Sequence, residues 1–457
     1  MDTLQAAFSS VTSAHVANSS PDLGIRLQDG KTSFQPGDTV TGYIYRTTPT
    51  ISSHAQCTVS LHGRAGSRVR TGSAYSSTDT YGIFKFFDPR RTTQVLYANV
   101  PLTIGPSGEG DGGAAGAKWY FSITIPTSAD SGSVAASGFS QDQSYLSLNP
   151  HDIATQPLPP TFQLSSTGVE AAVEYYLKAR LELSGKSNGF FAGLTGFKAH
   201  KAVLPLQVDS GSPRSSTRDF QLKGQTITRH VVSQRLVPGM ENAKLSFLQK
   251  TQKAVASSKV PHLALQIRVE VPQVLQLMNE NTVPFLVGIE PIWDETSEVL
   301  RGMDQNITLD CFKVHVKPTT SVRVQHSVFR SLLSESYASR DVMKLVTVDK
   351  LRPLDKKIQI PCGSTETSKG PGLVDVGWLV NFNLGERITR KLARERWETK
   401  IFPSFTTYNI QHTHELSWEL SGMIAGEKIQ LSGSNPVTLL PGVCEEDMRG
   451  AFQGKDG

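Results

Sequence analysis

The sequence contains little charge and little cysteine. Lys, Arg, Asp and Glu make up 19% of its 457 residues, below the roughly 25% usual for soluble domains, and the net charge is +5. This composition excludes a charge-rich disordered chain, and its electric field does not require nucleic acid as a partner, so we expect none. Its four cysteines include no CxxC pair, so we expect reduced thiols in the cytosol.

Long apolar runs are also missing. No stretch approaches the roughly 18 consecutive apolar residues of a membrane-spanning helix. Residues 1–20 have neither a basic start nor an unbroken apolar core, so they do not resemble a secretory signal. We therefore expect a cytoplasmic protein.

Period-two alternation dominates the apolar pattern. Every odd position from Val173 to Leu183 is apolar or tyrosine, while four of the five even positions are charged, which is typical of a half-buried strand. The phase changes between Leu309 and Phe312, which predicts a one-residue bulge. Similar alternation recurs at Val40–Ile44, Cys57–Leu61, Phe121–Ile125, Ala202–Val208, Leu263–Val271, Val283–Ile289, Val374–Leu384 and Tyr408–Leu420.

Many short strands with few helices predict an all-β protein made of two consecutive antiparallel β-sandwich domains of immunoglobulin-like type. Two loop insertions are expected in the first, at Gly105–Ala117 and Ser128–Ser147. The Ser-rich stretch SGSPRSST near the middle of the chain is the best domain boundary. The predicted order is a flexible tail at 1–20, a sandwich at 21–209, a linker at 210–217, a sandwich at 218–442 and a flexible tail at 443–457.

One basic segment has helical periodicity, Glu386 to Lys400. It carries a local net charge of +3, with Arg387, Arg390, Lys391 and Arg394 near its start. One interpretation is a surface helix packed on the sandwich through its apolar stripe. The other is contact with an anionic membrane. Three net charges contribute roughly 3 kcal/mol, less than the roughly 4 kcal/mol of a millimolar affinity, so such contact is weak and could only assist recruitment.

Motifs for catalysis are missing. The sequence contains no GxSxG, GxxxxGK[ST] or HExxH motif. His412 and His414 share one strand face, but they follow the inward phase and lack a third ligand nearby, so hydrogen-bonded core histidines are favoured over a metal site. Glu290, Asp294 and Glu295 are expected to be solvated. We therefore predict no catalytic residue, cofactor or metal, and a protein that is not an enzyme.

The order of several strand motifs resembles that of arrestin-like proteins, most closely the fungal arrestin-related (α-arrestin) group. The resemblance covers about residues 21–442. It rests on Leu23-Gly24-Ile25, Phe34–Gly42, the strand through Val59, Leu61 and Gly63, Trp119–Pro126, Val173–Ala179, Thr319–Arg323 and Pro403–Trp418.

The resemblance implies a non-catalytic adaptor that binds the tails of membrane transporters or receptors and links them to ubiquitination and endocytosis. Such a protein would be cytoplasmic and transiently at the plasma membrane or endosomes. Its strand edges and grooves would bind extended peptides by β-augmentation. The PPxY and LPxY motifs that recruit ubiquitin ligases in this group are missing, and Pro159-Pro160-Thr161-Phe162 ends in Phe. Contact with ubiquitin-ligase machinery is therefore expected to be indirect.

Two other functions fit an all-β chain. A β-sandwich carbohydrate-active enzyme would be secreted and would carry opposed carboxylates in a cleft. A structural subunit of an endosomal coat or retrieval complex would co-purify in a stable stoichiometric assembly, whereas an adaptor would bind transiently.

Ser212, followed by Pro213 and Arg214 in the expected linker, is a candidate regulatory phosphosite. A phosphate there adds nearly two negative charges between two domains. We expect Ser212→Glu to change cargo turnover and partner binding relative to Ser212→Ala, measured in cells that carry either variant. Identical behaviour of the two variants would leave only an ordinary solvated Ser-rich linker.

Overall fold

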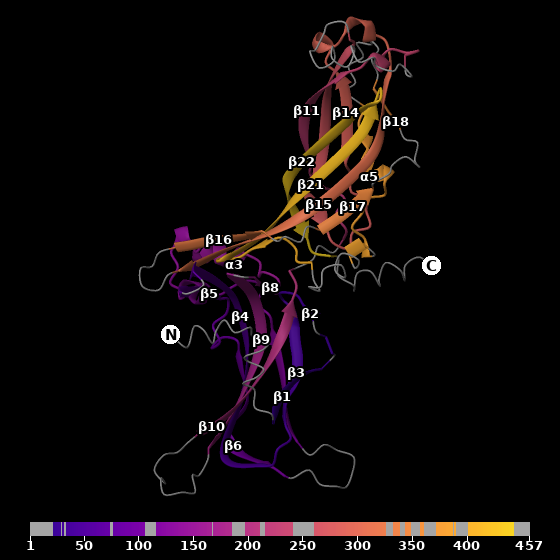
Figure 1. The fold of residues 1–457 in the computed structure, drawn as a ribbon. Helices are drawn as coiled ribbons and strands as arrows, with labels where there is room; N and C mark the ends of the chain where they lie inside the picture. Colours follow the sequence, from indigo (N-terminus) through magenta and orange to yellow (C-terminus); the bar gives the residue numbers. More distant parts are fainter. Residues whose placement is uncertain are drawn as a thin grey trace, which may run out of the picture. The chain divides into compact units, whose positions relative to one another are not determined.

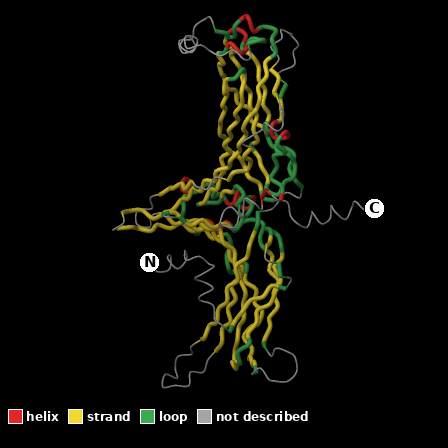
Figure 2. The backbone as a smooth tube through the Cα atoms, turned by 45° about the vertical axis from the view of Figure 1, so that its right-hand side comes forward, coloured by secondary structure: helices red, strands yellow, loops and turns green. Residues whose placement is uncertain are grey.

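The structure, a computed structural model, is dominated by β-strands. It describes residues 22–28, 30–31, 33–73, 76–105, 116–166, 168–184, 197–210, 215–240, 260–325, 332–338, 343–348, 357–360, 372–386, 388–389 and 401–442. Figure 2 shows strands in yellow throughout and helical turns in red in only a few places. The longest described helix, α3 (Pro150–Thr155), has six residues. The predicted all-β class with antiparallel sandwich domains and few short helices is confirmed.

Two compact units make up the chain. The first contains the described residues within 1–211, 320–337 and 405–412, and the second contains those within 212–319, 338–404 and 413–457. The division between residues 211 and 212 falls within the expected linker at 210–217. Two segments from the second half of the sequence nevertheless belong to the first unit. The expected tails at 1–20 and 443–457 lie outside the described residues.

The first unit contains a three-stranded and a seven-stranded sheet (Figure 1). The small sheet has the order β1-β3-β7, and the large sheet has the order β2-β10-β9-β4-β5, with β6 paired to β4 and β8 paired to β9. The strand bounds are β1 Leu23–Leu27, β2 Ser33–Phe34, β3 Thr39–Arg46, β4 Thr50–Ser73, β5 Ser76–Lys85, β6 Thr93–Ile104, β7 Ala117–Thr124, β8 Phe162–Ser165, β9 Val169–Ser184 and β10 Phe197–Val208.

Strand β9 has the burial phase that the sequence predicts. Val173, Leu177 and Leu181 are fully buried. The strand pairs antiparallel with β4 from Ala55 opposite Leu183 to Val69 opposite Val169, so apolar side chains of both strands point to one face. This long pairing makes β4 and β9 the centre of the large sheet.

Segments from the second half of the sequence complete the core of the first unit. The ring of Tyr408 stacks on Phe84 with centroids 5.1 Å apart, and Phe405 contacts Phe162 at 5.0 Å. The Ser67 hydroxyl donates to the carbonyl of Arg323 at 2.6 Å. Each of these contacts joins residues more than 240 positions apart in the sequence. Ser67 and Arg323, for example, are 256 residues apart.

The buried side chain of Asn409 reinforces this core. Its amide nitrogen donates to the Ser67 hydroxyl at 2.8 Å and to the Gly82 carbonyl at 3.0 Å. The backbone N–H of Arg323 donates to the Asn409 carbonyl at 2.9 Å. Because buried polar groups are costly unless they are paired, this set of bonds fixes how the three segments meet.

The remaining strands form two further sheets, and residues 320–337 and 405–412 of the larger one are counted with the first unit. The smaller has the order β11-β12-β14-β19, and the larger has the order β13-β22-β21-β15-β16, with β17 and β18 paired to β15 and β20 paired to β21. Phe285 packs against Phe312 at 4.8 Å and Trp418 at 5.4 Å in the core of the second unit. The strand bounds are β11 Leu222–Val232, β12 His262–Pro272, β13 Val274–Gln276, β14 Leu286–Pro291, β15 Gln305–Gln325, β16 Leu332–Ala338, β17 Met343–Val348, β18 Lys357–Ile360, β19 Val374–Asp375, β20 Phe405–Thr406, β21 Ile410–Ile424 and β22 Glu427–Leu440.

The predicted change of phase in β15 is confirmed. Ile307 and Leu309 are buried before it, and Phe312 and Val314 are buried after it. Against β17, a separate register shift follows between Val314 and His315. The irregularity lets one strand keep apolar side chains on the core side along its whole length.

Two expectations about local structure are wrong. The stretch Val374–Leu384, expected as a strand, contains only the two residues of β19 before helix α5 (Val376–Leu379) begins. The Asp375 carboxylate caps this helix by accepting the N–H of Trp378 at 3.0 Å. The stretch Ser128–Ser147, expected as a loop, contains α2 (Ser131–Ala135) and η2 (Gln141–Gln143). The remaining described helical turns are η3 Gln234–Leu236, η4 Trp293–Glu295 and η5 Glu298–Leu300.

Gly82 provides a test of the core of the first unit. A Cβ atom there would lie 2.7 Å from the Arg323 carbonyl oxygen and 2.8 Å from the Ser67 hydroxyl. We expect Gly82→Ala to lower the free energy of unfolding by about 1–3 kcal/mol because the backbone must shift. Urea titration measures the effect.

The matched control is Gly224→Ala on β11, where the nearest atom to an added Cβ is 3.7 Å away. We expect this variant to be neutral or slightly stabilising, because alanine reduces the entropy of the unfolded chain. Equal urea midpoints for the two variants would contradict the close packing described at Gly82.

Candidate docking surfaces

The candidate membrane-contact residues and the candidate phosphosite lie outside the described part of the chain. The membrane-contact candidates are Arg387, Arg390, Lys391 and Arg394, and the phosphosite candidate is Ser212. Next to the basic residues, Ile388 and Thr389 donate their N–H groups to the Gly385 carbonyl, which begins a helical turn. Ile388 also packs against the core of the second unit, as expected for the apolar stripe.

The two histidines of β21 are buried, and each contacts a hydroxyl group. His412 Nδ1 lies 2.9 Å from Thr320 Oγ1 in the first unit, and His414 Nδ1 lies 2.9 Å from Ser404 Oγ in the second. Among the residues that the structure describes, no group of three His, Cys, Asp or Glu side chains could hold a metal ion. These contacts fit hydrogen-bonded core histidines.

The other candidate chemical groups are two exposed carboxylates and a buried thiol. Asp294 and Glu295 are exposed, and Glu295 lies 3.7 Å from His230. Burial raises the pKa of the Cys57 thiol to about 12, so this thiol stays protonated at neutral pH and is a poor nucleophile.

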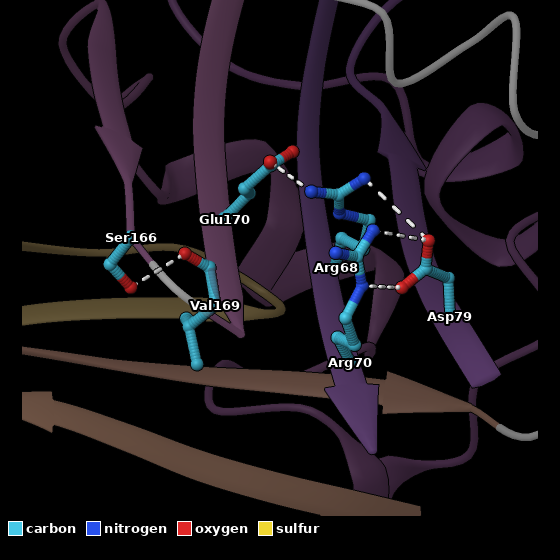
Figure 3. Close-up of polar contacts among 6 residues, drawn as sticks. All are labelled: Arg68, Arg70, Asp79, Ser166, Val169 and Glu170. Carbon is cyan, nitrogen blue, oxygen red and sulfur yellow. Dashed lines mark hydrogen bonds and ion pairs between the residues drawn. The ribbon is translucent and has the colours of Figure 1, made fainter. Parts of the chain in front are cut away.

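An ionic cluster connects the ends of three strands in the first unit (Figure 3). Arg70 on β4 donates to Asp79 on β5, with Nε 2.8 Å from Oδ1. Arg68 lies 3.7 Å from the same carboxylate and also pairs with Glu170 on β9. Both Arg70–Asp79 and Arg68–Glu170 are direct cross-strand neighbours. Two cations and two carboxylates therefore balance each other.

The charge cluster stabilises strand pairing. Hydrogen bonding to Arg70 and the nearby charge of Arg68 lower the pKa of Asp79 below its usual 3.8, against the effect of burial. Beside the cluster, the Ser166 hydroxyl donates to the Val169 carbonyl at 2.9 Å and closes the turn between β8 and β9. The alternate arginines at 68 and 70 signal a basic strand face in the sequence, but their partners are not visible there.

Strand β11 is a long and accessible sheet edge in the described part of the chain. It has 11 residues, of which seven are exposed and only Val231 is buried. Among described strands it pairs only with β12, so it stands at the end of its sheet (Figure 1). Alternate N–H and C=O groups of an antiparallel edge strand point away from its neighbour, where a further strand can bind them.

Other described edges are shorter, partly covered or irregular in their pairing. β1 has five residues and β19 has two. On β7, the Ser122 N–H already donates to the Gln94 side chain at 3.2 Å. Gly82 on β5 lies against the Arg323 carbonyl. The 12-residue β6 (Thr93–Ile104) is longer and has eight exposed residues, but its register with β4 is irregular and its Pro101 lacks an N–H. We therefore take β11, which pairs regularly with β12 along its whole length, as the candidate edge.

The charge of β11 is positive. Lys223 and Arg229 are exposed, and the strand contains no Asp or Glu. An incoming strand with acidic side chains would gain both backbone hydrogen bonds and favourable charge pairing. Sequence alternation alone could not identify this edge, because neither strand order nor exposure is visible in a single sequence.

Comparison with known proteins identifies no family. No model of a known protein family matches the chain, and no curated protein matches it. None of the described helices is both long enough and apolar enough to cross a membrane.

The ionic cluster predicts acid-dependent stability. Asp79→Asn should lower the free energy of unfolding at neutral pH by no more than about 1 kcal/mol, because Arg70 is half exposed and its charge is screened. Since the folded-state pKa of Asp79 is lowered, its contribution is fully present above the unfolded value of 3.8 and is lost as the pH falls below it.

Urea midpoints at neutral pH, at about pH 5 and at about pH 3 would measure this trend. The difference between the original protein and Asp79→Asn should be similar at the first two values and smaller at the third. Glu415→Gln, which changes an exposed carboxylate on β21, is the control and should have little effect. A difference that grows on acidification would contradict the assigned pairing.

Proposed function

We propose that the protein is a non-catalytic, arrestin-like adaptor that binds extended segments of membrane-protein cargo. The observation that carries the proposal is the long, exposed and positively charged edge of β11. A strand edge recognises an extended chain through its backbone, so it can accept many sequences that share little beyond acidic character. The resemblance of the strand motifs to the arrestin-related group supports the same role.

Cargo tails suit such an edge. Unstructured segments of transporters or receptors can extend along a strand without unfolding a domain, although they lose entropy on ordering. The resulting binding is transient, which suits an adaptor that releases its cargo. We propose that the protein is cytoplasmic and visits the plasma membrane or endosomes while cargo is bound.

Coupling to ubiquitination requires a further partner. The chain contains no PPxY or LPxY motif, so the WW domains of a ligase lack their usual tyrosine-containing site. We propose that a second adaptor connects this protein with the ubiquitin-ligase machinery. Cargo binding and ligase recruitment would then be separable.

Proximity labelling in the native cell tests this function. The original protein should label membrane transporters or receptors together with components of the ubiquitin machinery. Charge reversal on the edge, Lys223→Glu with Arg229→Glu, should reduce cargo labelling about tenfold, because two attractive charge pairs become repulsive. The ligase components should remain labelled, since their recruitment does not depend on β11.

The matched control is Lys428→Glu with Arg301→Glu, an exposed lysine and arginine of the same unit outside β11. It makes the same change in net charge and should leave cargo labelling intact. Equal loss in both double variants would mean that overall charge, not the edge, controls binding. Labelling of neither membrane proteins nor ubiquitin machinery by the original protein would contradict the adaptor role.

A further inference from the structure

The outward face of the small sheet in the first unit has an unusual composition. Strands β1, β3 and β7 contain no Asp or Glu at all. Their register places side chains in rows across the sheet, with Arg26, Tyr43 and Tyr120 in one row and Gly24, Tyr45 and Lys118 in the next. We call the five side chains Arg26, Tyr43, Tyr45, Lys118 and Tyr120 the tyrosine face.

The three tyrosine rings form a continuous layer. The Tyr43 ring centroid lies 6.2 Å from that of Tyr45 and 5.8 Å from that of Tyr120. Tyr45 lies across Gly24, where an added Cβ would approach its ring to 2.3 Å, so the glycine lets the ring lie on the backbone of β1. Tyr120 is 69% exposed and Tyr45 is 38% exposed, although both are large side chains.

Two cations flank this aromatic layer. Lys118 Nζ lies 5.3 Å from the centre of the Tyr43 ring. Arg26, directly opposite Tyr43, is exposed, and its interaction with the tyrosine hydroxyl raises the pKa of the guanidinium. A cation–π contact holds a cation at the face of a ring. The side of the cation that points away from the ring can still bind an anion.

The other outward positions are small and neutral, so the face is flat. In the neighbouring rows Thr41 lies opposite Ser122, and Thr39 lies opposite Thr124 with hydroxyls 3.1 Å apart. Strands of five, eight and eight residues spaced about 4.8 Å apart cover roughly 340 Å². A stable protein interface buries about 800 Å² on each partner, so this face is too small to hold a folded protein by itself.

We propose that the tyrosine face is a contact site for an anionic phospholipid surface. Tyrosine is favoured at the level of lipid headgroups because its ring is apolar and its hydroxyl can remain hydrated. Arg26 and Lys118 pair with headgroup phosphates and carboxylates, and the absence of acidic residues from the three strands removes repulsion. A fluid, flat surface also needs no pocket or protruding side chain for shape complementarity.

The contact is weak by itself. Each basic side chain near an anionic bilayer contributes about a fivefold gain in partitioning, so the two together contribute about 25-fold. Such a site adds to another membrane contact, such as bound cargo, and does not replace it. The inference depends on the residues of the first unit and not on the proposed cargo edge, which lies in the second.

Vesicle sedimentation with the full chain tests the proposal. The probes are phosphatidylcholine vesicles with and without about 30 mol% phosphatidylserine, at about 0.1 M salt. We expect partitioning onto the anionic vesicles to exceed that onto neutral vesicles at least tenfold and to be lost at about 1 M salt, where charges are screened within about 3 Å. Arg26→Gln with Lys118→Gln should reduce it about 25-fold.

Two further variants separate the face from its alternatives. Tyr120→Ser, at a mostly exposed position, should weaken vesicle binding severalfold without changing the unfolding midpoint. Lys223→Gln with Arg229→Gln on β11 removes the same net charge and should leave vesicle binding unchanged. That variant would still disturb cargo binding, so failure of one proposal can be distinguished from failure of the other.

Three outcomes would overturn the proposal. One is equal vesicle binding by the original protein and the Arg26→Gln, Lys118→Gln variant. The second is loss of binding only when Arg387, Arg390, Lys391 and Arg394 are changed to Gln, which would assign membrane contact to the basic segment. The third is failure to bind anionic vesicles while a purified acidic protein binds in a Tyr120-dependent manner, which would make the face a protein interface.

Discussion

The buried hydrogen bonds around Asn409 are the constraint on which the first unit depends. Asn409 and Ser67 are 342 residues apart in the sequence, yet they meet at 2.8 Å with no exposure to solvent. Polar groups in such a position are expensive to bury unless every segment that supplies a partner is present. The core of the first unit is therefore completed only after the second half of the chain has been made, and contacts of such long range favour slow folding.

The alternation of buried and exposed residues within a strand could be predicted from the sequence. Which strands become neighbours could not. The alternation from Val173 to Leu183 follows from a period of two, and the change of phase between Leu309 and Phe312 was visible for the same reason. Nothing local in the sequence reveals that Tyr408 stacks on Phe84, because that contact depends on which strands become neighbours. The stretch after Val374 was mistaken for a strand because the cap by Asp375 allows a helix to begin within an apolar run.

The candidate surfaces could be identified only from the structure, for the same reason. Tyr43, Tyr120 and Arg26 come from three strands, and only the register places them in one row. Arg68 and Arg70 look alike in the sequence as alternate basic residues, but paired carboxylates largely neutralise them in the structure. A basic residue therefore marks an anion-binding surface only when no carboxylate lies beside it. Arg26 and Lys118 on the tyrosine face meet this condition, whereas Arg46 on β3, which pairs with Asp22, and the arginines of the ionic cluster do not.

An open strand edge must also avoid pairing with copies of itself. On β11, Lys223 and Arg229 would face like charges in a second copy, and such repulsion is a common protection of natural edges. The same charges favour an acidic extended segment, so a single feature both disfavours self-association and selects the partner. If that segment belongs to a membrane protein, a weak lipid contact elsewhere on the chain raises its effective concentration at the edge. Two modest interactions can in this way produce binding that depends on both the cargo and the membrane that carries it.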